Sequence, residues 1–363
     1  MLTATLVLLS GIISWLVVYK LIHCASDFGL VQNPNHRSSH TQPTPSGGGL
    51  GILIGVTLSG GYLAWNRDPR DLEMFSVLGL SCALGVVGLL DDVSHLSARS
   101  RLGIQILVCG LLLFTVSHSP LSTMLPGATH HLGSPVLLLI FTMVLVFAAV
   151  WWINLFNFMD GIDGIAGAQA VFMLLAAAFL AASFNPSLLS DSVWVWTLCI
   201  ASATSGFLGF NWPPAKIFMG DVGSTFLAFI IFAVAFLSIT LAWFPPYQGI
   251  GAWLILGSVF IVDASVTLII RIFRRQRWYE AHRSHVYQRL YRRSVRLGSN
   301  AAQTTQCAIA INLLWVAPLA WACLAFPKWA LCWTIVAYLP LILGAVVIGA
   351  GMPDRQESNS SSL

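Results

Sequence analysis

Long apolar runs separated by short polar segments recur along almost the whole chain of 363 residues. Each run is long enough to cross a hydrocarbon layer about 30 Å thick as a helix. The runs lack the alternation typical of strands, and backbone groups in lipid must be paired within their own segment, so the pattern predicts a helical bundle. We expect about eleven helices, with ten as the alternative number, over residues 3–23, 48–65, 72–90, 102–117, 134–153, 165–184, 192–210, 223–244, 251–271, 303–325 and 329–349.

Composition narrows the class of protein. Hydrophobic residues make up 57% of the chain and charged residues only 9%, whereas a soluble domain carries roughly 25% charged residues. A water-soluble globule, a nucleic-acid-binding protein and a disordered chain are therefore excluded. We interpret the chain as an all-α polytopic membrane protein, with one integral-membrane domain over residues 1–350 and a polar tail over residues 351–363.

Basic residues lie almost entirely on one side of this predicted bundle. That side holds 15 of the 18 Lys and Arg residues, and the other side holds only Arg67, Arg70 and Lys328. The positive-inside rule makes the basic side cytoplasmic, which places the N-terminus outside and the C-terminal tail inside. The first positive charge, Lys20, follows the first apolar run, so we expect a retained first span and no cleaved signal peptide.

Five aspartates stand in cytoplasmic loops at the ends of predicted helices: Asp91, Asp92, Asp160, Asp163 and Asp221. Two of them are adjacent in the run GLLDDVSHLSARSRLG, which also contains Arg101. Adjacent carboxylates at a membrane boundary repel each other, and a bound cation or a raised pKa would relieve that repulsion. The alternative is a solvated loop that begins after a helix.

The run NLFNFMDGIDGIAG places Asn154, Asn157, Asp160 and Asp163 at every third position. If the segment is helical, their oxygen atoms lie close to one face. Oxygen ligands suit Mg²⁺, which usually takes one or two carboxylates together with substrate phosphates. A hydrogen-bonded helix terminus is the structural alternative.

In the run NWPPAKIFMGDVGSTFLAF, Asp221 lies just before an apolar helix whose N-terminus favours an anion. Phe218 is a candidate stacking surface for a base, although a Phe beside a span is more often packed in the core or against lipid.

Two further loops are candidates for phosphate binding. The arginine-rich run RIFRRQRWYEAHRSHVYQRLYRRSVR can clamp an anion with His282 or His285 nearby, or can be an interfacial helix that only sets topology. In RSSHTQPTPSGGGLG, residues 37–51, the N–H groups of Gly47, Gly48 and Gly49 can face a phosphate, or the glycines can be a flexible lead-in to the next helix.

Taken together and in this order, the Asp91-Asp92 pair, the NxxNxxDGIDG run and the KIFMGD run resemble the polyprenyl-phosphate N-acetylhexosamine-1-phosphate transferase family over roughly residues 30–350. The loops RSSHTQPTPSGGG and AHRSHVYQ look more like the O-antigen-initiating branch than the lipid I enzyme. The resemblance implies transfer of a sugar-1-phosphate from a UDP-N-acetylhexosamine to undecaprenyl phosphate in the bacterial inner membrane, with release of UMP. It also implies Mg²⁺ as cofactor, with Mn²⁺ as the alternative ion.

The resemblance also implies roles for particular residues. Asp91, Asp92 and Asp160 would be catalytic, and Asn157, Asp160 and Asp221 would surround the metal. Asp163, Asn211 and Phe218 would bind uridine, and Arg101, Arg283 and His285 would bind phosphate. Many relatives carry a His-x-His-His cluster where this chain reads His285-Val286-Tyr287-Gln288, so a role that needs several histidines does not carry over.

Alternatives remain at this point. A transporter would place acids at the bilayer midplane, with inverted repeats and broken helices, and only Asp263 lies well within a predicted span. A non-catalytic scaffold would not require the aspartates. An acid in lipid is costly, so we expect Asp263 to have a partner or to line a groove for the lipid phosphate. The sequence leaves open the hexosamine, the glycan pathway (O-antigen, peptidoglycan or another), and whether the chain is a homodimer.

Overall fold

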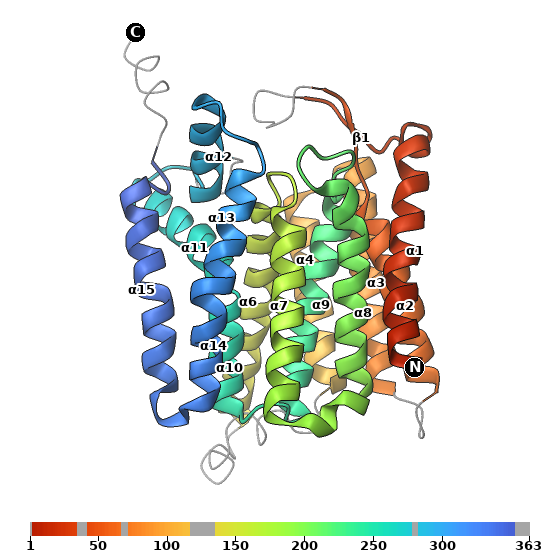
Figure 1. Cartoon of the computed structure of the whole chain (residues 1–363), viewed down its shortest axis with the longest axis vertical. Coiled ribbons are helices and arrows are strands. Elements are labelled where there is room, and N and C mark those ends of the chain that lie inside the picture. The colour runs from red at the N-terminus through yellow and green to blue at the C-terminus, as the bar shows by residue number, and fades with distance from the viewer. Residues whose placement is uncertain (1, 35–41, 67–71, 117–134, 278–281, 353–363) are drawn as a thin grey trace.

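The computed structural model describes residues 2–34, 42–66, 72–116, 135–277 and 282–352. Its long helices lie side by side and form one bundle (Figure 1). The α-helices are α1 Leu2–Cys24, α2 Gly49–Trp65, α3 Leu72–Ser94, α4 Ala98–Val116, α6 Pro135–Met159, α7 Ile165–Phe184, α8 Ser192–Asn211, α9 Gly220–Thr240, α10 Pro246–Leu256, α11 Ser258–Phe273, α12 Val286–Arg296, α13 Gln303–Ile311, α14 Ala317–Ala325 and α15 Ala330–Ile348. The shorter elements are 3₁₀ turns η1 Ala25–Phe28, η3 Pro186–Ser190 and η5 Pro327–Trp329, the π-helical turn η4 Asn312–Val316, and strands β1 Val31–Gln32 and β2 Thr44–Pro45.

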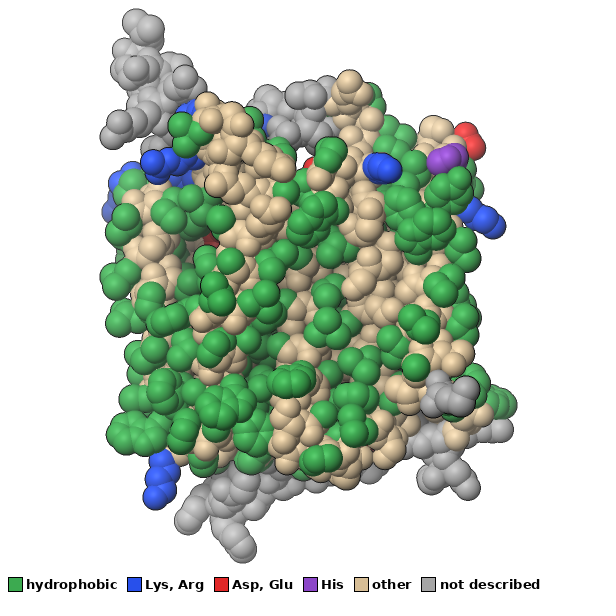
Figure 2. All heavy atoms as spheres, viewed as in Figure 1, with side chains coloured by type: hydrophobic (Ala, Val, Ile, Leu, Met, Phe, Trp, Pro, Cys, Tyr) green, Lys and Arg blue, Asp and Glu red, His purple; other side chains and the backbone are tan. Residues whose placement is uncertain are grey.

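The helices confirm the predicted class. Within the described residues, nine helices are long and apolar enough to cross a membrane, and the bent pair α10–α11 makes a tenth. The 17-residue helix α2 is also apolar. Figure 2 shows hydrophobic side chains along the whole height of the visible face, with basic side chains towards its two ends. The chain is therefore a polytopic membrane protein.

Several helix boundaries differ from the sequence prediction, and three of these differences matter for the site and for the bundle. Helix α6 continues to Met159, six residues past the expected end, and α9 begins at Gly220 instead of residue 223. Asp221 therefore lies in the first turn of α9 and not before it. The span predicted over 251–271 is two helices that meet at Gly257 with a bend of 69°. The length of an apolar run shows whether it can span a membrane, but not whether its helix bends. The sequence therefore could not show this break.

Helix α9 is the centre of the bundle. It is the most deeply buried membrane-length helix described, and α2, α3, α6, α7, α8 and α10 all pack against it. The indole N–H of Trp152 on α6 donates to the carbonyl of Ala228 on α9 at 2.9 Å. The indole N–H of Trp253 on α10 donates to Ser238 on α9, also at 2.9 Å. These buried hydrogen bonds hold the central helix in register with its neighbours.

A short antiparallel ribbon covers the start of α9. In it Val31 pairs with Pro45, and Gln32 pairs with Thr44. The chain then turns into α2, where the backbone N–H groups of Gly48 and Gly49 donate to the carbonyls of Phe218 and Met219 at 2.9 Å each. A side chain at Gly49 would collide with the backbone of Gly223, so this close approach requires glycine.

The glycine loop therefore corrects one expectation. The N–H groups of Gly48 and Gly49 bind the segment before α9 and do not face a phosphate. Residues 37–41 of the same loop lie outside the described residues, as do Arg67, Arg70 and the tail from residue 353 on.

Candidate active site

A cavity of about 900 Å³ opens at the end of the bundle where α3 and α6 end and α9 begins. All five loop aspartates line it. Ten of the eleven residues implied by the resemblance lie in its wall: Asp91, Asp92, Arg101, Asn157, Asp160, Asp163, Asn211, Phe218, Asp221 and Arg283. The expectation that these motifs meet at one face of the bundle is confirmed.

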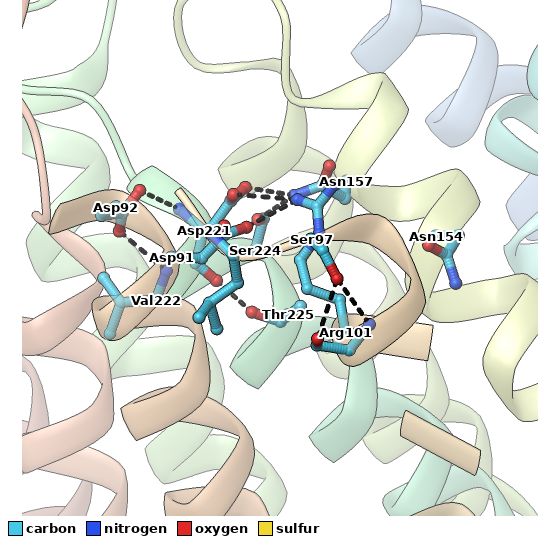
Figure 3. Close-up of polar contacts among 12 residues, drawn as sticks. Asp91, Asp92, Ser97, Arg101, Asn154, Asn157, Asp221, Val222, Ser224 and Thr225 are labelled. Atoms are coloured by element: carbon cyan, nitrogen blue, oxygen red, sulfur yellow. Dashed lines mark hydrogen bonds and ion pairs between the residues drawn. The ribbon is translucent and has the colours of Figure 1, made fainter. Parts of the chain in front are cut away.

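The two adjacent aspartates point to different partners (Figure 3). Asp92 accepts hydrogen bonds from the backbone N–H groups of Asp221 at 2.8 Å and Val222 at 3.0 Å. It therefore satisfies the first turn of α9, whose own N-cap residue, Met219, supplies no side-chain acceptor. The N-terminus of this helix was expected to attract an anion, and that anion is the carboxylate of Asp92.

Arg101 connects two of the acids. Its guanidinium donates to Asp91 at 2.6 Å and lies 3.5 Å from Asp221. The second oxygen of Asp91 accepts from the backbone N–H of Leu96 at 2.7 Å. Asp91 is only 5% exposed, so both of its oxygen atoms are held in a protected position.

Asn157 completes this cluster from the last turns of α6. Its side-chain amide donates to Asp221 at 2.6 Å and to Ser224 at 2.8 Å. Asn154, one turn earlier, instead donates to Gln105 at 2.7 Å and lies apart from the cluster. Because α6 ends at Met159, Asp160 and Asp163 follow in a loop and do not continue the helical face that the spacing predicted.

Asp160, in the loop after α6, has a strongly raised pKa. Burial raises the pKa of its carboxyl to about 7, and the negative charges of Asp221, Asp92 and Asp163 act in the same direction. The cavity therefore holds more negative charge than its side chains neutralise, and a bound cation would relieve the excess.

The residues expected to bind uridine are Asp163 in the loop after α6, Asn211 at the end of α8, and Phe218 in the segment before α9. Asp163 accepts from the backbone N–H of Ala215 at 2.9 Å. The Asn211 side chain accepts from the N–H of Gly164 at 3.0 Å and donates to the carbonyl of Ile217 at 2.9 Å. Asn211 is 4% exposed, so in this structure it joins two loops of the cavity wall.

Phe218 lies between these loops and the glycine turn. Its backbone N–H donates to the carbonyl of Pro45 at 2.8 Å, and its carbonyl accepts from Gly48. The backbone is thus anchored on both sides, while the residue lines the cavity. A ring held in this way can offer a flat surface to a base.

Of the eleven residues implied by the resemblance, His285 is the one that does not line the cavity. It is 3% exposed, and its Nδ1 lies 3.3 Å from a carboxylate oxygen of Asp263. The phosphate-binding role implied for His285 is therefore not supported by its position. The same carboxylate accepts from the N–H groups of Val286 at 2.8 Å and Tyr287 at 2.9 Å, so Asp263 has the partners expected of an acid within a span.

His282 and Arg283 line the cavity in front of this buried pair. Burial, with the nearby charges of His285 and Arg271, lowers the pKa of His282 to about 3. The His282 ring is therefore neutral near pH 7 and serves as a hydrogen-bonding group, while Arg283 contributes a positive charge.

Two residues of the cavity wall that the sequence did not single out have buried polar atoms without a hydrogen-bond partner in the described part of the chain. The hydroxyl of Ser46 and the side-chain carbonyl of Gln288 are buried and have no hydrogen-bond partner among the described residues. Gln288 occupies the last position of the run that departs from the His-x-His-His pattern. That departure was a usable signal for Gln288, whereas nothing in the local sequence distinguished Ser46.

The oxygen atoms of the cavity wall suit the coordination of Mg²⁺. The wall offers carboxylate and amide oxygens, which this ion prefers, and an excess of negative charge around Asp160. No three acidic, His or Cys side chains in the described part of the chain form a closed metal site. Mg²⁺ commonly completes its coordination with water and substrate phosphates, so an open set of oxygens fits this ion.

Comparison with known proteins identifies the family. Residues 74–240 match the family described as Glycosyl transferase family 4. A Bacillus subtilis protein named probable undecaprenyl-phosphate N-acetylglucosaminyl 1-phosphate transferase is 31% identical over 274 residues, which cover 73% of this chain and 71% of the relative. The chain belongs to the polyprenyl-phosphate hexosamine-1-phosphate transferase family.

Other members of this transferase family are similar over comparable lengths. A phospho-N-acetylmuramoyl-pentapeptide-transferase of Deinococcus radiodurans is 29% identical over 287 residues, covering 72% of this chain and 85% of the relative. The enzyme of that name from Mycolicibacterium gilvum is 33% identical over 285 residues, with 66% and 74% covered. As a transferase of this family, the chain transfers a sugar phosphate to a polyprenyl phosphate.

Proposed function

We propose that this transferase moves N-acetylhexosamine-1-phosphate from a UDP-sugar to undecaprenyl phosphate, releasing UMP and forming a lipid-linked sugar diphosphate. The observation that carries the proposal is the gathering of five aspartates from three loops in one cavity at the end of a membrane bundle. A water-soluble donor and a lipid-embedded acceptor can meet only at such an end. The product would begin O-antigen or a related envelope glycan in the bacterial inner membrane, with the site cytoplasmic, the N-terminus outside and the C-terminus inside.

Both substrates are anions, so their approach is repulsive until charge is neutralised. Arg283 and Arg101 would supply positive charge from two sides of the cavity. Asp221, Asn157 and Asp160 would hold Mg²⁺, which when bound polarises phosphoryl oxygens and offsets the charge of the donor diphosphate. Phe218 and Asp163 would orient the uridine, and Asn211 would keep their two loops together.

We propose a direct displacement in which the acceptor phosphate attacks the phosphorus that bears the sugar. A phosphate monoester with a second pKa of about 6 is largely ionised at pH 7, so a general base has little to remove. The bonds of Asp92 to α9 and of Asp91 to Arg101 support positioning roles and leave neither carboxylate as an unpartnered nucleophile.

A second candidate substrate is UDP-N-acetylmuramoyl-pentapeptide, because two of the relatives are named for transfer of that group. A cation-coupled transporter is a weaker alternative. Its expected broken helix is present as α10–α11, but the acid on α11, Asp263, is bonded to the start of α12.

The test is an assay of the purified full chain with undecaprenyl phosphate, Mg²⁺ and a panel of UDP-sugars that includes the muramoyl-pentapeptide. UMP and the lipid product are measured together. We expect UMP release that depends on the lipid and on Mg²⁺, and no turnover in Asp221→Asn, which loses a proposed metal charge. A folded protein that gives no lipid product with any donor would contradict the proposal.

A further inference from the structure

A second hollow, of about 490 Å³, lies where α12 meets the carboxyl end of α15. Four arginines line it (Arg289, Arg292, Arg293 and Arg296), and Val347 and Ile348 form part of its apolar wall. We call it the arginine groove. Figure 2 shows basic side chains at the end of the bundle where Figure 1 places the carboxyl end of α15.

The helix itself explains how the arginines converge. Positions 292, 293 and 296 lie three, four and seven residues after position 289, so the four arginines share one face of α12. No carboxylate lines the groove among the described residues. Four like charges on one face repel each other, and a bound anion would stabilise them.

Two hydrogen bonds of Arg289 determine how deep the arginine groove lies relative to the membrane. The guanidinium of Arg289 donates to the carbonyl of Ile348 at 3.2 Å and to that of Met352 at 3.0 Å. Since α15 is part of a membrane-length span, its last turn marks the boundary between hydrocarbon and water. The arginines therefore lie at the level of lipid phosphates, and Val347, which is 86% exposed, faces the level of the acyl chains.

From this arrangement we propose that the arginine groove binds an anionic glycerophospholipid, with its phosphate on the arginines and the upper part of an acyl chain on the apolar wall. A free phosphate would use only the charged half of the groove. Basic pockets between membrane helices commonly bind anionic headgroups in this way. The site is separate from the aspartate-lined cavity and does not depend on the proposed reaction.

Arg293 and Arg296 are the residues to test, because both are exposed and neither side chain has a hydrogen bond or ion pair to another described residue. Arg289 and Arg292 instead donate to backbone carbonyls. The double variant Arg293→Gln/Arg296→Gln removes two charges from the groove. A matched control, Arg274→Gln/Arg275→Gln, removes two exposed charges at the end of α11, outside the groove.

Phosphatidylglycerol, phosphatidylcholine and undecaprenyl phosphate are titrated separately into the purified full chain in detergent, and bound lipid is measured by native mass spectrometry. We expect phosphatidylglycerol to bind in preference to phosphatidylcholine. The groove variant should bind phosphatidylglycerol roughly thirty-fold more weakly, about fivefold for each lost charge, and the control should bind it as the parent does.

Three results would overturn the proposal. One is unchanged phosphatidylglycerol binding in the groove variant, and another is an equal loss in both variants, which would indicate a general effect of net charge. The third is displacement of phosphatidylglycerol from the parent by an equal concentration of undecaprenyl phosphate, which would make the groove the acceptor's site. The melting temperature of each variant in lipid-free detergent verifies that it is folded.

Discussion

The carboxylate of Asp92, at the end of α3, caps the amino terminus of α9 by accepting the N–H of Asp221, in the first turn of that helix, at 2.8 Å. The two residues are 129 positions apart in the chain. A helix that begins without its own capping side chain is thus completed by an acid from a neighbouring helix. This bond joins the Asp-Asp motif to the central helix.

Asp92→Ala should lower the stability of the protein by about 0.5–2 kcal/mol, the usual cost of losing a helix cap. Asp92→Asn keeps one acceptor oxygen and should lose less. The melting temperatures of the purified variants measure this order. Equal losses of stability in Asp92→Ala and Asp92→Asn would argue against the capping role.

Phe218→Ala should weaken the binding of UMP and raise the KM for the nucleotide sugar. Stacking of a base on an aromatic side chain contributes about 1–3 kcal/mol, which corresponds to one to two decades in affinity. The backbone of Phe218 is anchored on both sides, so truncation should leave the loop in place. Phe218→Tyr keeps the ring and should bind UMP normally. If Phe218→Ala binds UMP as the parent does, the ring only packs.

Asp263→Ala should lose activity mainly by destabilising the segment before α12. It leaves the N–H groups of Val286 and Tyr287 without an acceptor, at about 1–3 kcal/mol for each group. Asp263→Asn retains one acceptor oxygen and should be affected much less. Melting temperature and activity are compared in both variants. An Asp263→Asn protein with the parent's stability but no turnover would place this carboxylate in the chemistry.

Asp160 should make the protein less stable as pH rises. Its folded pKa of about 7 lies above the unfolded value of about 3.9, so the folded state binds more protons between these values. Stability from this group is present below about pH 4 and is lost as pH rises to about 7. In a chelator, the melting temperature of Asp160→Asn should fall less steeply than that of the parent between about pH 4 and 7. Parallel curves would contradict the expectation.

Direct displacement predicts that labelled UMP does not exchange into UDP-sugar in the absence of lipid acceptor. A covalent phospho-sugar enzyme would allow that exchange. The measurement requires protein freed of bound lipid. Robust exchange in such protein, abolished in Asp91→Asn, would establish the covalent route instead.

Local sequence was sufficient for the position of most helices and for ten of the residues that line the cavity. Each loop between two membrane-spanning helices must lie at one of the two faces of the bundle. Counting the helices along the chain therefore shows which loops lie at the same face. The loops that carry Asp91, Asp160 and Asp221 lie at the same face by this count, and the three residues line one cavity. It could not reveal the bend at Gly257, because the apolar character of the chain is the same on both sides of the break.

The histidine loop shows a different limit. His282 and His285 are three residues apart, and both were candidates for an anion. Only His282 lines the cavity, because the carboxylate of Asp263, 22 residues earlier than His285, holds His285 in the interior. Nothing in the run itself distinguishes the two rings.

The sequence by itself determined the membrane class, the side of the bundle that carries the acids, and the residue types available there, because these follow from the length of apolar runs and the count of charges. Only the tertiary structure decided which hydrogen bond or ion pair each carboxylate makes. Asp92 caps α9 and Asp91 binds Arg101 because the end of α3 meets the start of α9 and the side of α4. Hydrogen bonds and ion pairs depend on distances of a few ångströms, and such distances between remote segments exist only once the helices have packed.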